Sequence, residues 1–199
     1  MNLFKRNMLA GVYFLAMVIV ANFYLTSAGF FFFQDDFFEI NISKAVDLKS
    51  YFQFFVFRYD IIAYRPISLQ NYFFFSNYLF NLNPVGFRLI SITTLFLSSF
   101  LISKVIAKIT KSPATVLISA IFWLTSSIHF MAITWIAAAY NIIGTFFFLL
   151  TTLIFLKFLE HKSFKYYMLA LLSFLLTIGS FVFSVTCTLI LLSYLIIKI

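Results

Sequence analysis

The chain has 199 residues, of which 63% are hydrophobic, 22% aromatic and only 10% charged. Soluble domains carry about 25% charged residues, so the composition excludes an ordinary soluble protein and indicates one that resides in a membrane. The formal charge of +8 does not by itself point to nucleic acid, because the basic residues follow a membrane-topology pattern.

The predicted membrane-spanning helices follow from the uncharged stretches, since about 20 apolar residues cross a bilayer as a helix. Residues 8–28 carry no charge, and residues 84–103 carry only Arg88, near their start. Residues 112–156 and 166–197 are uncharged and too long for one crossing each. Ser-Ser-Ile-His at 126–129 and Ile-Gly-Ser at 178–180 mark the expected turns. The predicted spans are therefore 8–28, 84–103, 113–128, 132–156, 166–179 and 181–197.

The expected fold class is an all-α integral membrane protein, a single transmembrane domain over residues 1–199 with about six transmembrane helices. The apolar runs are continuous and show no alternation of period two, which favours helices over strands. Residues 8–28 could instead be a cleaved signal peptide, because small residues at 26–28 resemble a cleavage site. The length of this stretch and the five spans that follow favour a retained helix.

The basic residues predict the orientation of the helices. Nine of the fourteen fall on one side of the predicted spans, which the positive-inside rule makes cytoplasmic. Both termini are then cytoplasmic, Glu160 is the one acid on that side, and no nucleic-acid partner is expected. The nine are Lys5, Arg6, Lys104, Lys108, Lys111, Lys157, Lys162, Lys165 and Lys198.

The segment 29–83 between the first two spans is expected to form a long outer loop with short interfacial helices. It carries five of the six acids, namely Asp35, Asp36, Glu39, Asp47 and Asp60. Pro66 suits the first turn of a helix, and Asn83-Pro84 reads as a turn into the second span. Long, charged loops often hold functional residues, so we place the candidate site here.

The adjacent Asp35 and Asp36 stand in a run of phenylalanines, "FFFQDDFFEI". Neighbouring carboxylates repel, and desolvation near lipid raises their pKa values further. Such a pair requires a cation, hydrogen-bond donors or a catalytic task, and Arg65 is the best internal counter-charge. The alternative is that one of the two aspartates only caps the next helix and faces open water. The spacing leaves both interpretations open.

The order of motifs resembles a known family. "FQDDFFEI" follows the first span, "YRPISLQNYFFFSNYLFNLNPVGF" leads into the second, and "SSIHFMAITW" closes the third-to-fourth hairpin. This order is similar to the N-terminal membrane module of C-type glycosyltransferases, closest to bacterial relatives of the protein O-mannosyltransferases. The resemblance implies a polyprenyl-phosphate-linked sugar as donor and a glycan, lipid or protein as acceptor. It also implies transfer with inversion on the non-cytoplasmic side of a bacterial inner membrane.

Carried over by position, the resemblance makes Asp35 and Asp36 the catalytic acids, one acting as base. Tyr64 and Arg65 would bind substrate, with Arg65 facing the donor phosphate or the acid pair. His129 and Trp135 would face the same cavity, although a lone histidine at a turn is more often structural. No cofactor is expected. A divalent cation is an open alternative, but no Asp-x-Asp spacing supports it.

The chain also departs from the family. Met131 stands where relatives often carry an acid, Ala137–Ala139 replace an arginine-rich stretch, and 181–184 lack a Lys-Glu pair. Family members commonly have more spans, so the chain is expected to be part of a longer enzyme or a short, divergent member. The alternative function is an inactive relative that binds lipid-linked sugar or acts as an assembly partner. A transporter ranks last, since ionisable residues are nearly absent from the spans.

Overall fold

The computed structural model describes residues 3–26, 29–57, 64–110, 112–181 and 185–198. It is 83% helix, with no strand among these residues, which confirms the all-α class. The predicted end of the first span at 27–28, the start of the sixth at 182–184, and the charged residues Arg58, Asp60 and Lys111 lie outside the described residues.

The described residues form ten α-helices, two 3-10 helices and one π-helix. They are α1 (Leu3–Leu25), α2 (Asp35–Ile42), α3 (Leu48–Phe52), the 3-10 helix η1 (Gln53–Phe55), the π-helix η2 (Pro66–Asn71), α4 (Tyr72–Phe80), α5 (Pro84–Ile109), α6 (Pro113–Thr125), α7 (Ile128–Thr134), the 3-10 helix η3 (Ile136–Ala139), α8 (Tyr140–His161), α9 (Phe164–Ile178) and α10 (Val185–Lys198).

Three helices are long and apolar enough to cross a membrane: α1, α5, and the segment Ile136–His161 that includes α8. A fourth span results if α6 and α7, which meet at a bend of 48°, are counted as one crossing. The bend lies at Ser126 and Ser127, and the chain breaks again at Trp135 before η3. The helices α9 and α10 are shorter, at 15 and 14 residues.

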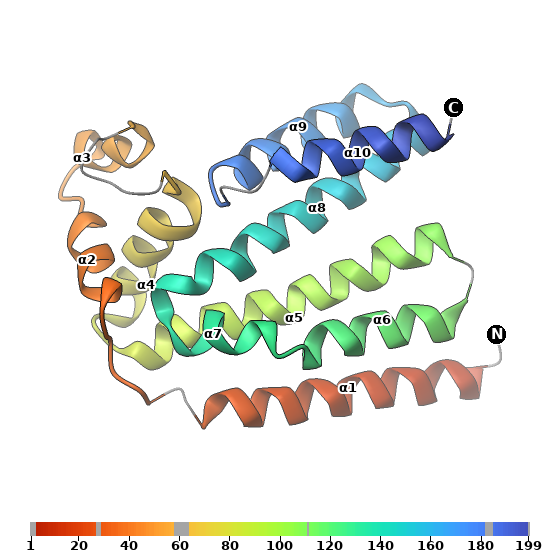
Figure 1. The fold of residues 1–199 in the computed structure, drawn as a ribbon, viewed down its shortest axis with the longest axis horizontal. Coiled ribbons are helices and arrows are strands. Elements are labelled where there is room, and N and C mark those ends of the chain that lie inside the picture. Colours follow the sequence, from red (N-terminus) through yellow and green to blue (C-terminus); the bar gives the residue numbers. More distant parts are fainter. Residues whose placement is uncertain (1–2, 27–28, 58–63, 111, 182–184, 199) are drawn as a thin grey trace.

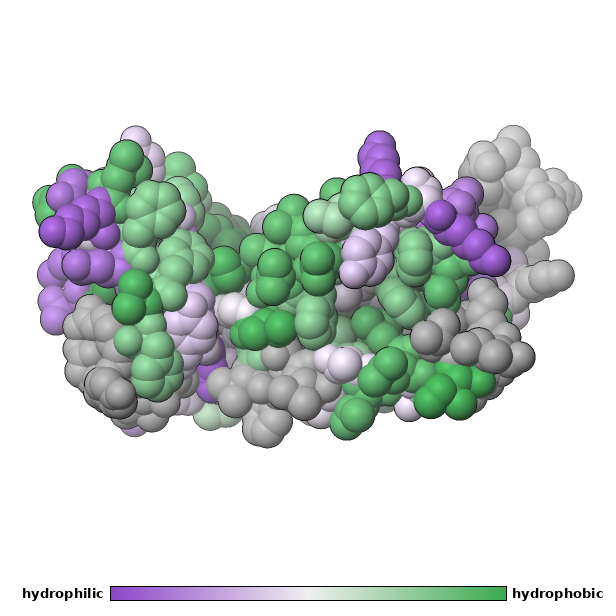
Figure 2. Space-filling model, turned by 90° about the horizontal axis from the view of Figure 1, so that it is seen from above, coloured by the Kyte–Doolittle hydropathy of each residue, from purple (hydrophilic) through white to green (hydrophobic). Residues whose placement is uncertain are grey.

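The long helices run roughly side by side, and shorter helices gather at one end of the bundle (Figure 1). One end holds α2, α3 and α4, and we call it the acidic end because it carries Asp35, Asp36, Glu39 and Asp47. The opposite end holds the start of α1, the α5–α6 and α8–α9 connections and the end of α10. We call it the lysine end after Lys104, Lys108, Lys157, Lys162 and Lys165. On the face seen in Figure 2, most of the coloured surface between the two ends is apolar.

The acidic end is fixed to the bundle by close packing of α4 on α5. Asn83 caps α5 by accepting a hydrogen bond from the Val85 N–H at 3.0 Å, and Pro84 follows at the first helical position. A Cβ on Gly86 would lie 2.1 Å from Cγ of Phe80, so only glycine permits this approach. A buried aromatic cluster that includes Phe32, Phe73 and Phe87 continues the contact toward α2 and η3.

Candidate functional site

Helix α2 places three carboxylates at the acidic end in three different environments. Successive helical residues point about 100° apart, so Asp35 and Asp36 face different directions although they are adjacent. Asp35 is exposed, whereas Asp36 is fully buried and Glu39 is 9% exposed. Because the three acids differ in their access to solvent, each can serve a different role.

Asp36 is an anchor that joins α2 to a distant part of the chain. One carboxylate oxygen accepts a hydrogen bond from the Phe33 N–H at 3.1 Å, and the other accepts from the Ala137 N–H in η3 at 2.6 Å. Burial raises the pKa of Asp36, while these two bonds and the charge of Arg88 oppose the rise. The N-cap of α2 is Gln34, so neither aspartate holds that position.

Arg88, the one charged residue in the second predicted span, supplies the counter-charge that the sequence assigned to Arg65. It is fully buried in α5. Its guanidinium donates hydrogen bonds to the carbonyl of Phe30 and, at 2.9 Å, to the carbonyl of Thr134. Arg88 therefore contacts the same two segments that Asp36 joins, the one before α2 and the one before η3. An isolated charge in an apolar helix is itself a signal of a functional or structural polar site.

Glu39 is a site residue that the sequence reasoning did not single out. Its Oε2 atom is buried and has no hydrogen-bond partner among the described residues. Burial raises the pKa of Glu39 to about 7, the charge of Arg65 opposes the rise, and Asp35 and Asp36 add to it. A carboxyl group with this pKa exchanges its proton at neutral pH, as a general acid or base requires. Its signal in the sequence is the helical spacing from Asp35 and Asp36.

Arg65 presents a guanidinium with unused hydrogen-bonding capacity. Its Cζ atom lies 3.6 Å from the centroid of the Tyr140 ring, at the start of α8. Its Nε atom is buried and has no hydrogen-bond partner in the part of the chain that the structure describes. Stacking on a ring leaves the in-plane N–H donors of an arginine available to an anion.

The helix that follows Arg65 is a π-helix with buried polar side chains. Ser68 donates a hydrogen bond to the carbonyl of Ser180 at 2.5 Å, and the Asn71 amide donates to the carbonyl of Pro66 at 2.7 Å. The Gln70 Oε1 atom is buried without a partner among the described residues. π-helical turns often occur at functional sites, so η2 and the residues around it belong to the candidate site.

The remaining predicted site residues are placed differently from one another. The Trp135 ring lies 6.1 Å from the ring of Phe33, beside the turn that leads into α2. His129 is 3% exposed; its Nε2 shares a hydrogen bond with the Trp123 carbonyl at 2.8 Å, so its polar contact is with α6. Tyr64 donates a hydrogen bond to the carbonyl of Phe55 at 2.8 Å. Of these three, Trp135 has the contact nearest to the acids.

An apolar cavity of about 240 Å³ lies between α4, α5 and α8, next to η2. Its lining is Ile67, Asn71, Tyr72, Phe75, Ile90, Thr94, Ile143, Phe146 and Phe147. Among the described residues, no group of three or more His, Cys, Asp or Glu side chains is arranged to hold a metal ion. The site thus combines ionisable groups with an apolar space at one end of the bundle.

Comparisons with protein-family models, with curated proteins and with solved structures give no match.

Glu39 is expected to make stability depend on pH. Its folded pKa of about 7 lies above its ordinary value of 4.5, so the folded state binds this proton more tightly than the unfolded state. The contribution of Glu39 to stability is then fully present below about pH 4.5 and is lost as the pH rises toward 7. Each unit of pKa shift is worth about 1.4 kcal/mol, so Glu39→Gln should remove on the order of 1–3 kcal/mol of this decline.

The measurement is unfolding of the detergent-solubilised protein from pH 5 to 8, with Asp47→Asn as the control. Asp47 is an exposed acid that caps α3 through the Ser50 N–H. Its pKa is lowered by the bonds to Ser50, so its contribution is lost only at acid pH. Identical pH profiles for Glu39→Gln and the unsubstituted protein would contradict the assignment.

Proposed function

We propose that the protein is a membrane glycosyltransferase, or the N-terminal part of one. It transfers a sugar from a polyprenyl phosphate to a glycan, lipid or protein acceptor on the non-cytoplasmic side of a bacterial inner membrane. In this proposal α9 and α10 also cross the membrane, giving six spans, and the lysine end is cytoplasmic. The observation that supports it is the set of three carboxylates on α2 beside Arg65 and Arg88, at one end of apolar helices.

The proposed reaction begins with an acceptor hydroxyl next to Asp35, the exposed acid. The acceptor oxygen attacks the anomeric carbon from the face opposite the phosphate, and its proton passes to the Asp35 carboxylate. The bond between the anomeric carbon and the phosphate oxygen breaks, and polyprenyl phosphate leaves with the electron pair. The anomeric centre is inverted. A positioned base of this kind contributes about 10²–10⁴-fold to the rate.

The other groups bind and orient in this scheme. Arg65 neutralises the leaving phosphate, because a guanidinium matches phosphate oxygens with two parallel donors. The rings of Tyr64 and Trp135 are suited to contact with a sugar face. The apolar cavity between α4, α5 and α8 is suited to the first isoprene units of the donor. Asp36 and Arg88 position α2 and do not touch substrate.

Asp35→Asn is expected to lower sugar transfer by about 100-fold or more, because the amide cannot accept the proton. The assay uses the reconstituted protein with a polyprenyl-phosphate-linked sugar and a soluble acceptor. Asp47→Asn is the matched control, since Asp47 is an exposed acid on the same segment, and it should retain full activity. Full activity in both Asp35→Asn and Glu39→Gln would rule out a base on α2.

The alternative is an inactive relative that binds lipid-linked sugar or acts as an assembly partner. The apolar residues Met131 and Ala137–Ala139, at positions where relatives carry charges, favour it. In addition, the Ala137 N–H is occupied by Asp36. A binder would retain capture of the donor without transfer, and Asp35→Asn would then leave capture unchanged. The same assay, read as bound donor and as product, separates the two functions.

The proposed orientation predicts which cysteines an impermeant thiol reagent can reach from outside the cell. Lys49→Cys at the acidic end should be labelled, whereas Ile109→Cys and Lys165→Cys at the lysine end should be blocked until the cells are opened. All three positions are exposed in the fold, and the native Cys187 is buried and supplies little background. The opposite pattern would place the acids in the cytoplasm and contradict the proposed reaction.

A further inference from the structure

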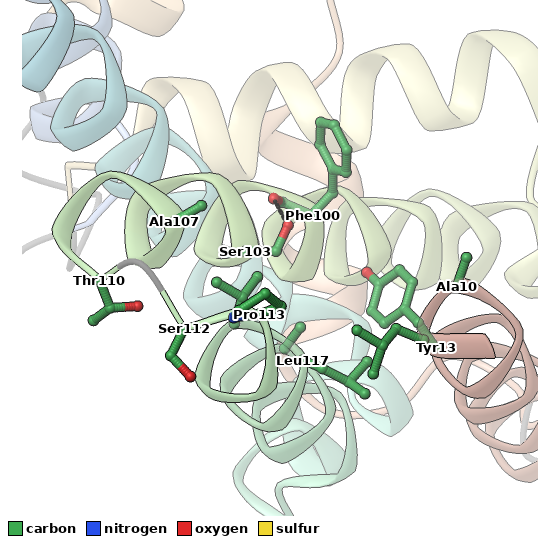
Figure 3. Close-up of a pocket in the computed structure, with 12 residues that line it drawn as sticks. Ala10, Tyr13, Phe100, Ser103, Ala107, Thr110, Ser112, Pro113 and Leu117 are labelled. Carbon is green, nitrogen blue, oxygen red and sulfur yellow. Dashed lines mark hydrogen bonds between the residues drawn. The ribbon is translucent and has the colours of Figure 1, made fainter. Parts of the chain in front are cut away.

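We infer that a groove between α1, α5 and α6 binds an anionic membrane phospholipid in the leaflet at the lysine end. The groove has a volume of about 480 Å³, within the range of about 300–1,000 Å³ that is usual for ligand pockets. It is separate from the acidic end and does not rest on the proposed sugar transfer. Figure 3 shows its walls, formed by Ala10 and Tyr13 of α1, by Phe100, Ser103 and Ala107 of α5, by Thr110 and Ser112 between α5 and α6, and by Pro113 and Leu117 of α6.

The groove is open because small side chains stand where its walls face the bilayer. Ala10 and Ala107 both line it and both are exposed, on opposite walls. The other lining side chains are mainly apolar, among them Leu9, Val116 and Leu117. Such a surface is matched by an acyl chain, which contacts it through van der Waals packing, the main attraction between apolar groups inside a bilayer.

The hydroxyl of Tyr13, which lines the groove, is already paired. The Tyr13 hydroxyl donates to Oγ of Ser99 at 3.0 Å, and the Ser99 hydroxyl donates to the Ala120 carbonyl at 3.0 Å. This chain of hydrogen bonds ties α1, α5 and α6 together. Because these groups satisfy one another, the interior of the groove needs no polar ligand and favours a hydrocarbon one.

Two groups that can bind a phosphate lie in the lining of the groove or beside it. The Lys104 ammonium lies 4.9 Å from the ring centroid of Phe100, which lines the groove. The Thr110 hydroxyl, also in the lining, is buried without a hydrogen-bond partner among the described residues. Lys108, on the same helix, is paired with Glu160 of α8. Lys104 is therefore the cation of α5 that can meet a lipid headgroup, by extending along the apolar wall to the interface.

The positive charge beside the groove argues against a second copy of the chain as the occupant. Copies inserted into one membrane share an orientation, so their lysine ends lie at the same depth. Like charges brought together at an interface are unfavourable. An anionic lipid brings the complementary charge and an apolar chain together.

The test is photolabelling of the full chain in vesicles that contain phosphatidylglycerol or phosphatidylcholine with a diazirine in one acyl chain. One lysine near the surface is worth about 1 kcal/mol toward an anionic lipid, or about fivefold. We therefore expect about fivefold more phosphatidylglycerol adduct on the groove residues. Lys104→Gln should lower this preference toward one, whereas Lys108→Gln, the matched control, should preserve it.

Ala10→Trp fills the groove and should remove about nine-tenths of the adducts on it, with Ala107→Trp as a second variant from the opposite wall. Val12→Trp is the control, because Val12 is exposed on α1 but does not line the groove. Equal labelling by the two lipids, unchanged labelling in both tryptophan variants, or cross-links to a second copy at this groove would each overturn the inference.

Discussion

Asp36→Ala is expected to lower the free energy of unfolding by about 3–5 kcal/mol. This is the usual effect of removing one partner of a buried ion pair. Asp36 is fully buried and accepts hydrogen bonds from the N–H groups of Phe33 and Ala137. Alanine leaves both N–H groups and the Arg88 guanidinium without their acceptor or counter-charge. Each unsatisfied buried N–H costs about 1–3 kcal/mol, which agrees with the total.

The same substitution also frees a strained turn. Gln34, directly before α2, has a φ of 49° and a ψ of −122°, a conformation that side-chain-bearing residues rarely adopt. The bond from the Phe33 N–H to Asp36 spans this residue and helps to hold it. Loss of Asp36 should therefore release α2 from the bundle before the apolar helices separate.

The measurement is unfolding of the purified protein by a denaturing detergent, followed by circular dichroism. Asp35→Ala is the matched control, since Asp35 is the exposed neighbour of Asp36 and should change stability by less than about 0.5 kcal/mol. Equal effects of the two substitutions would show that the buried anchor does not stabilise the fold. The pair also separates fold from chemistry, because the proposed reaction depends on Asp35.

The all-helical class and the long apolar helices α1, α5 and α8 could be predicted from the sequence, because about 20 uncharged residues in lipid form a helix. The sequence predicted a turn between two spans at 126–129, and the structure has a bend of 48° there, between α6 and α7. The second break at Trp135 and the short helix η3 were not predicted. They depend on the Ala137 N–H meeting Asp36, which lies 101 residues earlier. No local pattern reports a contact between positions so far apart.

The sequence predicted where the candidate site lies, but it did not predict which arginine faces which acid. The aspartates, Arg65 and Trp135 do lie at the acidic end. However, Arg88 acts on Asp36 and Arg65 acts on Glu39. The sequence analysis took Arg65 as the counter-charge of the aspartate pair and did not consider Arg88, which lies in an apolar span. Helix α2 packs against α4, η2 and η3, and the contact of Gly86 with Phe80 holds α4 close to α5. The pairing of acids with arginines follows from this tertiary packing.

Arg88→Met is expected to destabilise the protein by a similar amount, about 3–5 kcal/mol. It leaves the Asp36 carboxylate buried without a counter-charge and the carbonyls of Phe30 and Thr134 without their donors. Methionine fills much of the volume of the arginine chain, so the loss reports polar contacts more than packing. Lys104→Met is the matched control, because Lys104 is an exposed cation on the same helix.

The double variant Asp36→Ala with Arg88→Met should be less destabilised than the sum of the two single variants, by about 0.5–3 kcal/mol. Each single change leaves a buried charge uncompensated, and the double change removes both charges together. A strictly additive result would mean that Asp36 and Arg88 act independently, each only through its backbone partners. A destabilisation smaller than the sum would instead show that the two charges stabilise α2 and η3 together. The proposed chemistry at Asp35 requires α2 to be held in place in this way.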